Sequence, residues 1–266
     1  MTKSFCSCDG FSEDLFRTNH SNQRCAGAGV AHDPAYAVIV AGGAIEDPDK
    51  APVRQASLLI AADSGAEFLR KHGLTPNFLI GDFDSLSEET AAHFKSHKIR
   101  EVKFIALKRD KDKTDTEAAL DLAFEQGFTT SIVIGAMGGS RTDHELANML
   151  LIEHYAKKGM DVILYSKDTT VFGIPGMELD YFALKYQGRR AFHGTPGTWV
   201  SILPVTGLVE GVTTENLRFP LKDAYLRRGS TFSVSNEMLD STARVSVFLG
   251  FVLVILSKRK PPAPVG

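Results

Sequence analysis

Aspartates follow three successive apolar segments that have the length and composition of buried strands. They are Asp63 after residues 58–62, Asp82 and Asp84 after residues 78–80, and Asp112 and Asp115 after residues 102–107. Mg²⁺ is bound by one or two carboxylates together with water and substrate phosphates, because it requires oxygen ligands in an octahedron. An aspartate also often caps a helix or fills a turn. Three strand ends in succession nevertheless favour a site for magnesium and a nucleotide.

A second motif, at residues 138–144, combines glycines with charged side chains in the order Gly-Gly-Ser-Arg-Thr-Asp-His. Glycines let the backbone approach a ligand closely, and a helix N-terminus offers free amides to an anion. Arg141 adds a planar donor for phosphate oxygens, and Lys113 is a second candidate for that role. Asp143 and His144 have simpler explanations, as a helix-dipole partner and a surface residue.

These residues must be positioned by strands that alternate with helices, which is typical of a mostly parallel sheet. We expect strands at residues 36–40, 58–62, 78–80, 102–107, 131–134 and 162–165, with helices at 66–71, 88–97, 116–125 and 144–158. The pairs Thr114/Glu117 and Thr142/Glu145 fit the capping-box pattern of a helix start. In such sheets ligands bind beyond the carboxyl ends of the strands, where the aspartates lie.

The sequence changes character after Pro175-Gly176, with alternating apolar and polar residues at 231–235 and 243–247 and frequent glycines. We therefore predict an α/β catalytic domain at 35–175, followed by a smaller all-β sandwich domain at 176–258. Residues 245–257 carry no charge but fall short of the roughly 20 residues of a membrane-spanning helix. They predict two buried strands that form a hairpin around Gly250.

The composition of the 266-residue chain is that of a folded protein, with 43% hydrophobic and 23% charged residues. A formal charge of −2 gives no electrostatic footprint for nucleic acid. The three cysteines all lie within the first 25 residues, without a standard zinc spacing, and we expect residues 1–34 to be a disordered leader. Residues 259–266 are expected to be a frayed tail. A main body without cysteine suits a cytoplasmic location.

Several of these segments together resemble the thiamine pyrophosphokinase family. The matching segments, in family order over about residues 36–257, are 61–66, 76–85, 112–118, 138–148, 203–214, 217–221 and 233–237. The resemblance implies an α/β catalytic domain and a β-sandwich that work as a homodimer with a shared active site. One departure is Ser64, which stands where the family usually has a glycine.

The resemblance also assigns roles to individual residues. Asp63, Asp82, Asp84 and Asp115 fall on the acidic magnesium–ATP positions, Phe219 on the position of an aromatic residue against the pyrimidine of thiamine, and Ser235 and Asn236 in the thiamine-contacting segment. From the residues alone, Phe219 would more simply pack inside the sandwich, since Leu217 and Leu221 share its parity on an extended strand.

The expected reaction is the transfer of a diphosphate group from ATP to the hydroxyl of thiamine. Asp82, Asp84 and Asp115 are the catalytic magnesium ligands in this interpretation, and Asp63, Asp112, Lys113, Arg141 and Asp143 bind the nucleotide. One alternative is a thiamine- or nucleotide-binding regulator without turnover. Another is a phosphohydrolase with an aspartate nucleophile. That class has its Asp-x-Asp pair after the first strand and a Thr or Val two positions later, where this chain has Leu86.

Overall fold

The computed structural model describes residues 35–46, 52–84, 86–96, 102–108, 112–177, 184 and 187–259. The expected leader, 1–34, lies outside these ranges, as does all but the first residue of the expected tail, 259–266.

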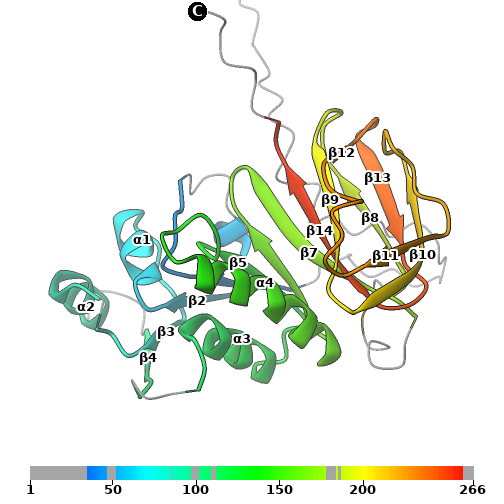
Figure 1. Ribbon diagram of the computed structural model, residues 1–266. Helices are drawn as coiled ribbons and strands as arrows, with labels where there is room; N and C mark the ends of the chain where they lie inside the picture. Colours follow the sequence, from blue (N-terminus) through cyan, green and yellow to red (C-terminus); the bar gives the residue numbers. More distant parts are fainter. Residues whose placement is uncertain are drawn as a thin grey trace, which may run out of the picture.

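A sheet of ten strands runs through the described part of the chain (Figure 1). Six strands are parallel, in the order β6-β5-β1-β2-β3-β4. Their bounds are β1 Ala37–Val40, β2 Leu58–Ala62, β3 Phe78–Gly81, β4 Lys103–Ala106, β5 Thr130–Ile134 and β6 Asp161–Tyr165. All six expected strands are thus confirmed, with small differences at their ends.

Helices cover both faces of this parallel region. They are the short 3-10 helix Pro52–Gln55, α1 Gly65–Lys71, α2 Glu88–Lys95, α3 Asp115–Glu125 and α4 Thr142–Lys157. Alternate side chains of β1 point to opposite faces. Ala37 and Ile39 pack in one apolar cluster with residues of α3 and α4, whereas Val38 and Val40 pack in another with residues of α1.

The ten-stranded sheet continues beyond β6 through antiparallel strands in the order β7-β14-β9-β12. These are β7 Thr169–Pro175, β14 Phe251–Ser257, β9 Trp199–Pro204 and β12 Asn236–Glu237. A second, four-stranded antiparallel sheet has the order β11-β10-β13-β8, with β11 Ala224–Arg227, β10 Leu208–Glu215, β13 Thr242–Ser246 and β8 Arg189–His193. The expected α/β region and all-β sandwich are both present, and they share one sheet.

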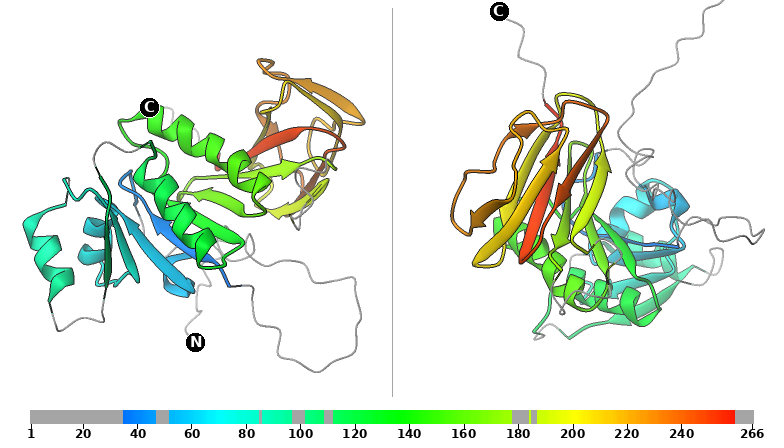
Figure 2. Two further views of the ribbon diagram at one scale, coloured as in Figure 1. Left: turned by 90° about the horizontal axis from the view of Figure 1, so that it is seen from below. Right: turned by 90° about the vertical axis from the view of Figure 1, so that its right-hand side faces the viewer.

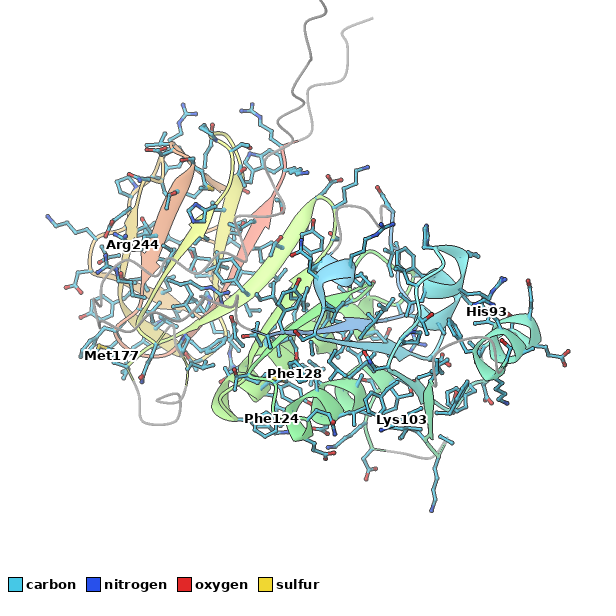
Figure 3. The ribbon with its side chains drawn as sticks, turned by 180° about the vertical axis from the view of Figure 1, so that it is seen from behind. His93, Lys103, Phe124, Phe128, Met177 and Arg244 are labelled. Atoms are coloured by element: carbon cyan, nitrogen blue, oxygen red, sulfur yellow. The ribbon has the colours of Figure 1, made fainter. Side chains whose placement is uncertain are left out.

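The four-stranded sheet packs on the same face of the large sheet as α1. A single apolar cluster contains Leu69 of α1 together with Val212 of β10, Val245 of β13 and Val254 of β14. Along the sheet, the sandwich lies at one end of the molecule, and α1 and α2 lie at the other, as the left view of Figure 2 shows. In Figure 3 Met177 and Arg244 mark the sandwich end, and His93 and Lys103 mark the opposite end.

The apolar segment 245–257 forms parts of two strands, as expected, but the hairpin is wrong. β13 and β14 belong to different sheets, and Gly250, with φ +91°, lies in the connection between them. β14 lies between β7 and β9 and is almost wholly buried. Its apolar character follows from burial on both faces of the sheet. No helix in the described part of the chain is long and apolar enough to cross a membrane.

Two further local expectations are wrong. Residues 231–235 form a turn rather than a strand, even though polar and apolar residues alternate there. The hydroxyl half of the expected capping box is confirmed at Thr114, whose Oγ1 accepts a hydrogen bond from the Glu117 amide at 3.2 Å. It is not formed at Thr142, which is already the first residue of α4. Glu145 instead accepts a hydrogen bond from the Gly138 amide at 3.3 Å and so fixes the preceding glycine loop.

A buried ion pair connects the two sheets. Arg190 of β8 donates a hydrogen bond to Asp161 of β6 at 2.9 Å, and both side chains are nearly inaccessible. The Arg190 guanidinium also lies 4.3 Å from the centre of the Phe172 ring on β7. Removing either partner would leave a buried charge uncompensated, so the two side chains depend on each other across the two sheets.

Candidate active site

The strand order creates an opening at the carboxyl ends of β1 and β5. These strands are neighbours, but the chain passes from β1 to β2 on one side and from β5 to β6 on the other. Connections that leave adjacent parallel strands in opposite directions form the crevice in which α/β proteins bind ligands. The strand order therefore places a crevice at the rim of the sheet where the site was expected.

The backbone segments that follow β1 and β5 are in direct contact. The amide of Gly43 donates a hydrogen bond to the carbonyl of Gly135 at 2.8 Å. A Cβ atom on Gly43 would lie 2.3 Å from that carbonyl oxygen, which is too close for any side chain. Glycine at this position thus lets the two segments approach closely and leaves the opening beside them lined by backbone.

A polar pocket of about 240 Å³ occupies this opening. Asp63, Ser64, Asp115, Arg141 and His144 are among the residues that line it. Asp63 follows β2 with φ +49°, and its amide is held by the carbonyl of Ile80 at 2.8 Å. The Oδ1 atom of Asp63 is buried. Asp115 begins α3 directly after the Thr114 cap. The structure therefore brings the carboxylates of two strand ends to one pocket with a guanidinium.

The Asp82–Asp84 turn lies beside Asp63. A Cβ atom on Gly81 would be 3.2 Å from both Cα and Cβ of Asp63, so the end of β3 contacts the start of the loop after β2. The Asp84 amide donates a hydrogen bond to Asp82 Oδ1 at 3.1 Å, and Phe83 between them has φ +63°. Asp82 is half-buried and Asp84 is exposed. The third carboxylate strand end is thus adjacent to the pocket, although neither aspartate lines it.

Glu67 of α1 fixes the far end of this aspartate turn. Its carboxylate accepts hydrogen bonds from the Ser87 amide at 2.9 Å and from the Thr90 hydroxyl at 2.6 Å. Burial acts to raise the pKa of Glu67, but these hydrogen bonds outweigh it and lower the pKa. Glu67 remains ionised and joins α1, which begins beside Asp63, to the segment that follows Asp84.

The other residues that the sequence analysis expected to bind the nucleotide have different surroundings. Arg141 donates two hydrogen bonds to Asp143, from Nε to Oδ1 at 2.9 Å and from Nη2 to Oδ2 at 2.7 Å. Both side chains are exposed, and the hydrogen bonds from Arg141 lower the pKa of Asp143. Lys113 lies 2.5 Å from Asp121 of α3, and this hydrogen bond raises the pKa of Lys113. Asp112 is exposed. Lys113 does not line the polar pocket, whereas Arg141 does.

The three thiamine candidates lie together in the sandwich, at the loop after β10 and at β12. Phe219 is 63% exposed, whereas Leu217 is buried. Packing of Phe219 inside the sandwich is therefore excluded. Buried Asn236 holds the Phe219 backbone on both sides, accepting from its amide at 3.0 Å and donating to its carbonyl at 2.6 Å. Ser235 has φ +60° and is exposed.

Asn148 is a residue of this site that the sequence analysis did not single out. It is buried on α4, lines the polar pocket, and donates a hydrogen bond to the Ala136 carbonyl at 3.0 Å. Its spacing from buried Ile152 and Tyr155 places it on the inner face of the helix. A polar residue on an otherwise apolar helix face was the signal that could have identified it.

Two family models match the chain, one for each part of the fold. Residues 50–164 match the thiamin pyrophosphokinase catalytic domain, and residues 189–250 match the thiamin pyrophosphokinase vitamin B1 binding domain. The first match contains the four acidic positions, and the second contains Phe219, Ser235 and Asn236. The chain belongs to the thiamin pyrophosphokinase family.

Similar proteins and solved structures support this membership. The chain is 27% identical over 201 residues to a thiamine pyrophosphokinase of Bacillus subtilis, a match that covers 76% of this chain and 87% of the relative. Solved thiamine pyrophosphokinases include one from Bacillus subtilis, with TM-score 0.71, 26% identity and coverage of 85% of this chain and 100% of that chain. Another, from Geobacillus thermodenitrificans, has TM-score 0.68, 27% identity and coverage of 86% and 100%.

Proposed function

We propose that this protein, as a thiamine pyrophosphokinase, transfers the diphosphate group of ATP to the hydroxyl of thiamine and releases AMP. The observation that carries this proposal is the polar pocket at the sheet's crevice, whose residues Asp63, Asp115 and Arg141 all lie within the match to the catalytic domain. An anionic nucleotide needs such a combination of carboxylates for a metal and a cation for phosphate oxygens.

The donor atoms around the pocket suit Mg²⁺. They are carboxylate oxygens, the ligands that this ion prefers, and Asp82, Asp84 and Asp115 would hold it. Among the described residues no three His, Cys, Asp or Glu side chains converge closely enough to bind a metal by themselves. A magnesium site that uses phosphate oxygens as further ligands does not require such convergence. When bound, the ion would neutralise the charge on the transferring phosphoryl oxygens.

The chain's own contribution to the reaction is alignment and charge. The oxygen of the thiamine hydroxyl forms a bond to the β-phosphorus, and the bond from that phosphorus to the α-phosphate oxygen breaks as AMP leaves. Arg141 binds phosphate oxygens at the start of α4, while Asp63 faces the nucleotide from the end of β2. A carboxylate of the aspartate group accepts the hydroxyl proton. Holding oxygen, phosphorus and leaving group in line accounts for most of the catalysis.

Thiamine would be bound by the sandwich. Phe219 presents an exposed ring that can stack on the pyrimidine, and Asn236 fixes the backbone on which that ring is carried. Because the side chain of Asn236 is engaged by the Phe219 backbone, we assign it to positioning of the ring. Ser235 lies next to it and is exposed to a ligand.

A homodimer is part of the proposal. Edge strand β12 pairs with β9 on one side, and large apolar side chains around this edge are exposed: Trp199 44%, Phe232 69% and Leu239 59%. Exposed large apolar side chains of this kind are typical of a protein interface. Sedimentation equilibrium of the full chain should give twice the monomer mass, and Phe232→Ser should weaken the dimer. A monomer at micromolar concentration would contradict this proposal.

The decisive experiment is a coupled assay for AMP with ATP, Mg²⁺ and thiamine. AMP should form in proportion to thiamine diphosphate and should not form without thiamine. Release of inorganic phosphate in the absence of thiamine would identify the phosphohydrolase instead. Binding of thiamine and ATP without any AMP would identify the regulator. The cytoplasmic location stays a prediction, which fractionation of cells would test.

A further inference from the structure

Helices α1 and α2 are joined by a network of hydrogen bonds around Glu67. One carboxylate oxygen of Glu67 accepts from the Ser87 amide at 2.9 Å, and the other accepts from the Thr90 hydroxyl at 2.6 Å. Thr90 is fully buried, and its hydroxyl in turn accepts from Arg70 Nε of α1 at 2.7 Å. Ser87 is the N-cap residue of α2. The start of α2 is therefore tied to α1 through a buried hydroxyl and a partly buried carboxylate.

The aspartate turn between Gly81 and Ser87 is held at both ends by one short segment, residues 63–67. Its near end contacts Asp63, since a Cβ atom on Gly81 would be 3.2 Å from the Asp63 backbone. Its far end is hydrogen-bonded to Glu67. Residues 63–67 form the turn that opens α1, with backbone hydrogen bonds of 3.1 and 3.0 Å. Because that turn is itself fixed, the two ends of the aspartate turn are held at a fixed separation.

The middle of the aspartate turn is held by β4. Phe83 has φ +63°, a left-handed conformation that a bulky residue seldom adopts. Its ring packs edge-on against Phe104 of β4, with ring centres 6.0 Å apart, and its carbonyl accepts from the Leu86 amide at 3.2 Å. A backbone conformation of this kind persists only where the surrounding contacts impose it. The orientation of the carboxylates on either side of Phe83 therefore depends on how the ends of the turn are held.

We propose that Glu67 is a positioning residue for the magnesium–nucleotide site, because its hold on Ser87 sets the spacing between Asp63 and the aspartate turn. The inference rests on the proposed function, since it concerns the same carboxylates. Glu67 does not line the polar pocket, so it acts through the aspartates and not on the ligand. The task requires a carboxylate, because both of its oxygens face donors. An amide would place an NH₂ group against one of them.

Glu67→Gln tests this role, and Glu89→Gln is the matched control. Glu89 lies on α2, its side chain is 74% exposed, and it pairs with Arg70 of the same network at 2.7 Å. Calorimetry would measure binding of α,β-methylene ATP, which cannot be cleaved at the reacting bridge, once with Mg²⁺ and once with EDTA. Groups that hold metal ligands in place contribute about 10- to 100-fold in metal affinity, so Glu67→Gln should reduce the gain from Mg²⁺ about 10-fold. Affinity in EDTA should be the same in all three proteins, and Glu89→Gln should match the wild type throughout.

Steady-state kinetics provides an independent readout. Glu67→Gln should raise the Mg²⁺ concentration that gives half-maximal AMP formation by a similar factor. The KM for thiamine should stay unchanged, because thiamine is assigned to the sandwich. A residue that only stabilises the fold would lower the melting temperature without this separation.

The possible outcomes distinguish this proposal from the proposed function. An unchanged gain from Mg²⁺ in Glu67→Gln, with or without a lower melting temperature, would overturn the role of Glu67. If Glu67→Gln fails to fold, Thr90→Val removes the hydroxyl that donates to Glu67, whereas Thr90→Ser keeps it. The gain from Mg²⁺ must then fall in Thr90→Val and persist in Thr90→Ser, and equal values in the two would overturn the proposal. A wild-type protein whose affinity for the analogue does not respond to Mg²⁺ would overturn the proposed metal–nucleotide site itself.

Discussion

Replacing Phe219 with alanine separates a ligand-binding ring from a structural one. Phe219 is 63% exposed, so about a third of its side chain is buried. Full burial of a phenylalanine stabilises a fold by roughly 1.5–3 kcal/mol, and the mutation should therefore cost only about 0.5–1 kcal/mol. The two hydrogen bonds from Asn236 reach the backbone of residue 219 and persist in the variant. The loop should keep its place.

The effect on thiamine should be larger than the effect on stability. Stacking of an aromatic ring on a base contributes about 1–3 kcal/mol, so the KM for thiamine should rise roughly 5- to 150-fold in Phe219→Ala. The KM for ATP should change little, because the proposed nucleotide pocket is formed by the other part of the fold. Initial rates of AMP formation, measured once with thiamine varied and once with ATP varied, give the two KM values. Thermal melting gives the change in stability.

Tyr225→Ala is a suitable control for this prediction. Tyr225 is 67% exposed on β11 of the same sandwich and has no proposed ligand contact. It should leave both KM values and the melting temperature nearly unchanged. The reasoning is refuted if Phe219→Ala loses several kcal/mol of stability, or if it binds thiamine as the wild type does.

Three further predictions concern the aspartate turn, the candidate phosphate-binding side chains and the buried ion pair. Asp82→Asn and Asp84→Asn should each reduce AMP formation to background, because the proposed task of these two side chains is to hold magnesium. The melting temperature should change little, since Asp82 is half-buried and Asp84 is exposed. Near-normal activity of both variants would contradict the magnesium assignment. Arg141→Met should raise the KM for ATP more than Lys113→Met does, since Arg141 lines the pocket whereas Lys113 is paired with Asp121. Steady-state kinetics that show the reverse order would place the phosphate site closer to α3. Arg190→Met should destabilise the protein by about 3–5 kcal/mol in urea unfolding, because Asp161 is left buried and charged, and a loss below ~1 kcal/mol would show that water compensates it.

The order of elements and the position of the acidic residues could be predicted because their signals are local. Runs such as 58–62 and 131–134 are apolar throughout, as buried parallel strands are, and the Thr114 cap depends on residues three positions apart. Given alternating strands and helices, the carboxyl ends of the parallel strands must share one rim. The placement of Asp63 and Asp115 at one pocket therefore followed from sequence.

Pairings between distant segments could be decided only by the tertiary structure. The apolar run 245–257 does not specify whether its strands pair with each other, and in the fold β14 pairs with β7 and β9 because it completes the large sheet there. Arg190 has several possible acidic partners in the sequence, and the packing of the two sheets selects Asp161, 29 residues away. Phe219 is exposed because the chain bends around Asn236, a contact 17 residues away in the sequence. Short-range patterns fix which local structure a segment adopts, whereas the partner of a strand edge or side chain depends on the geometry of the whole fold.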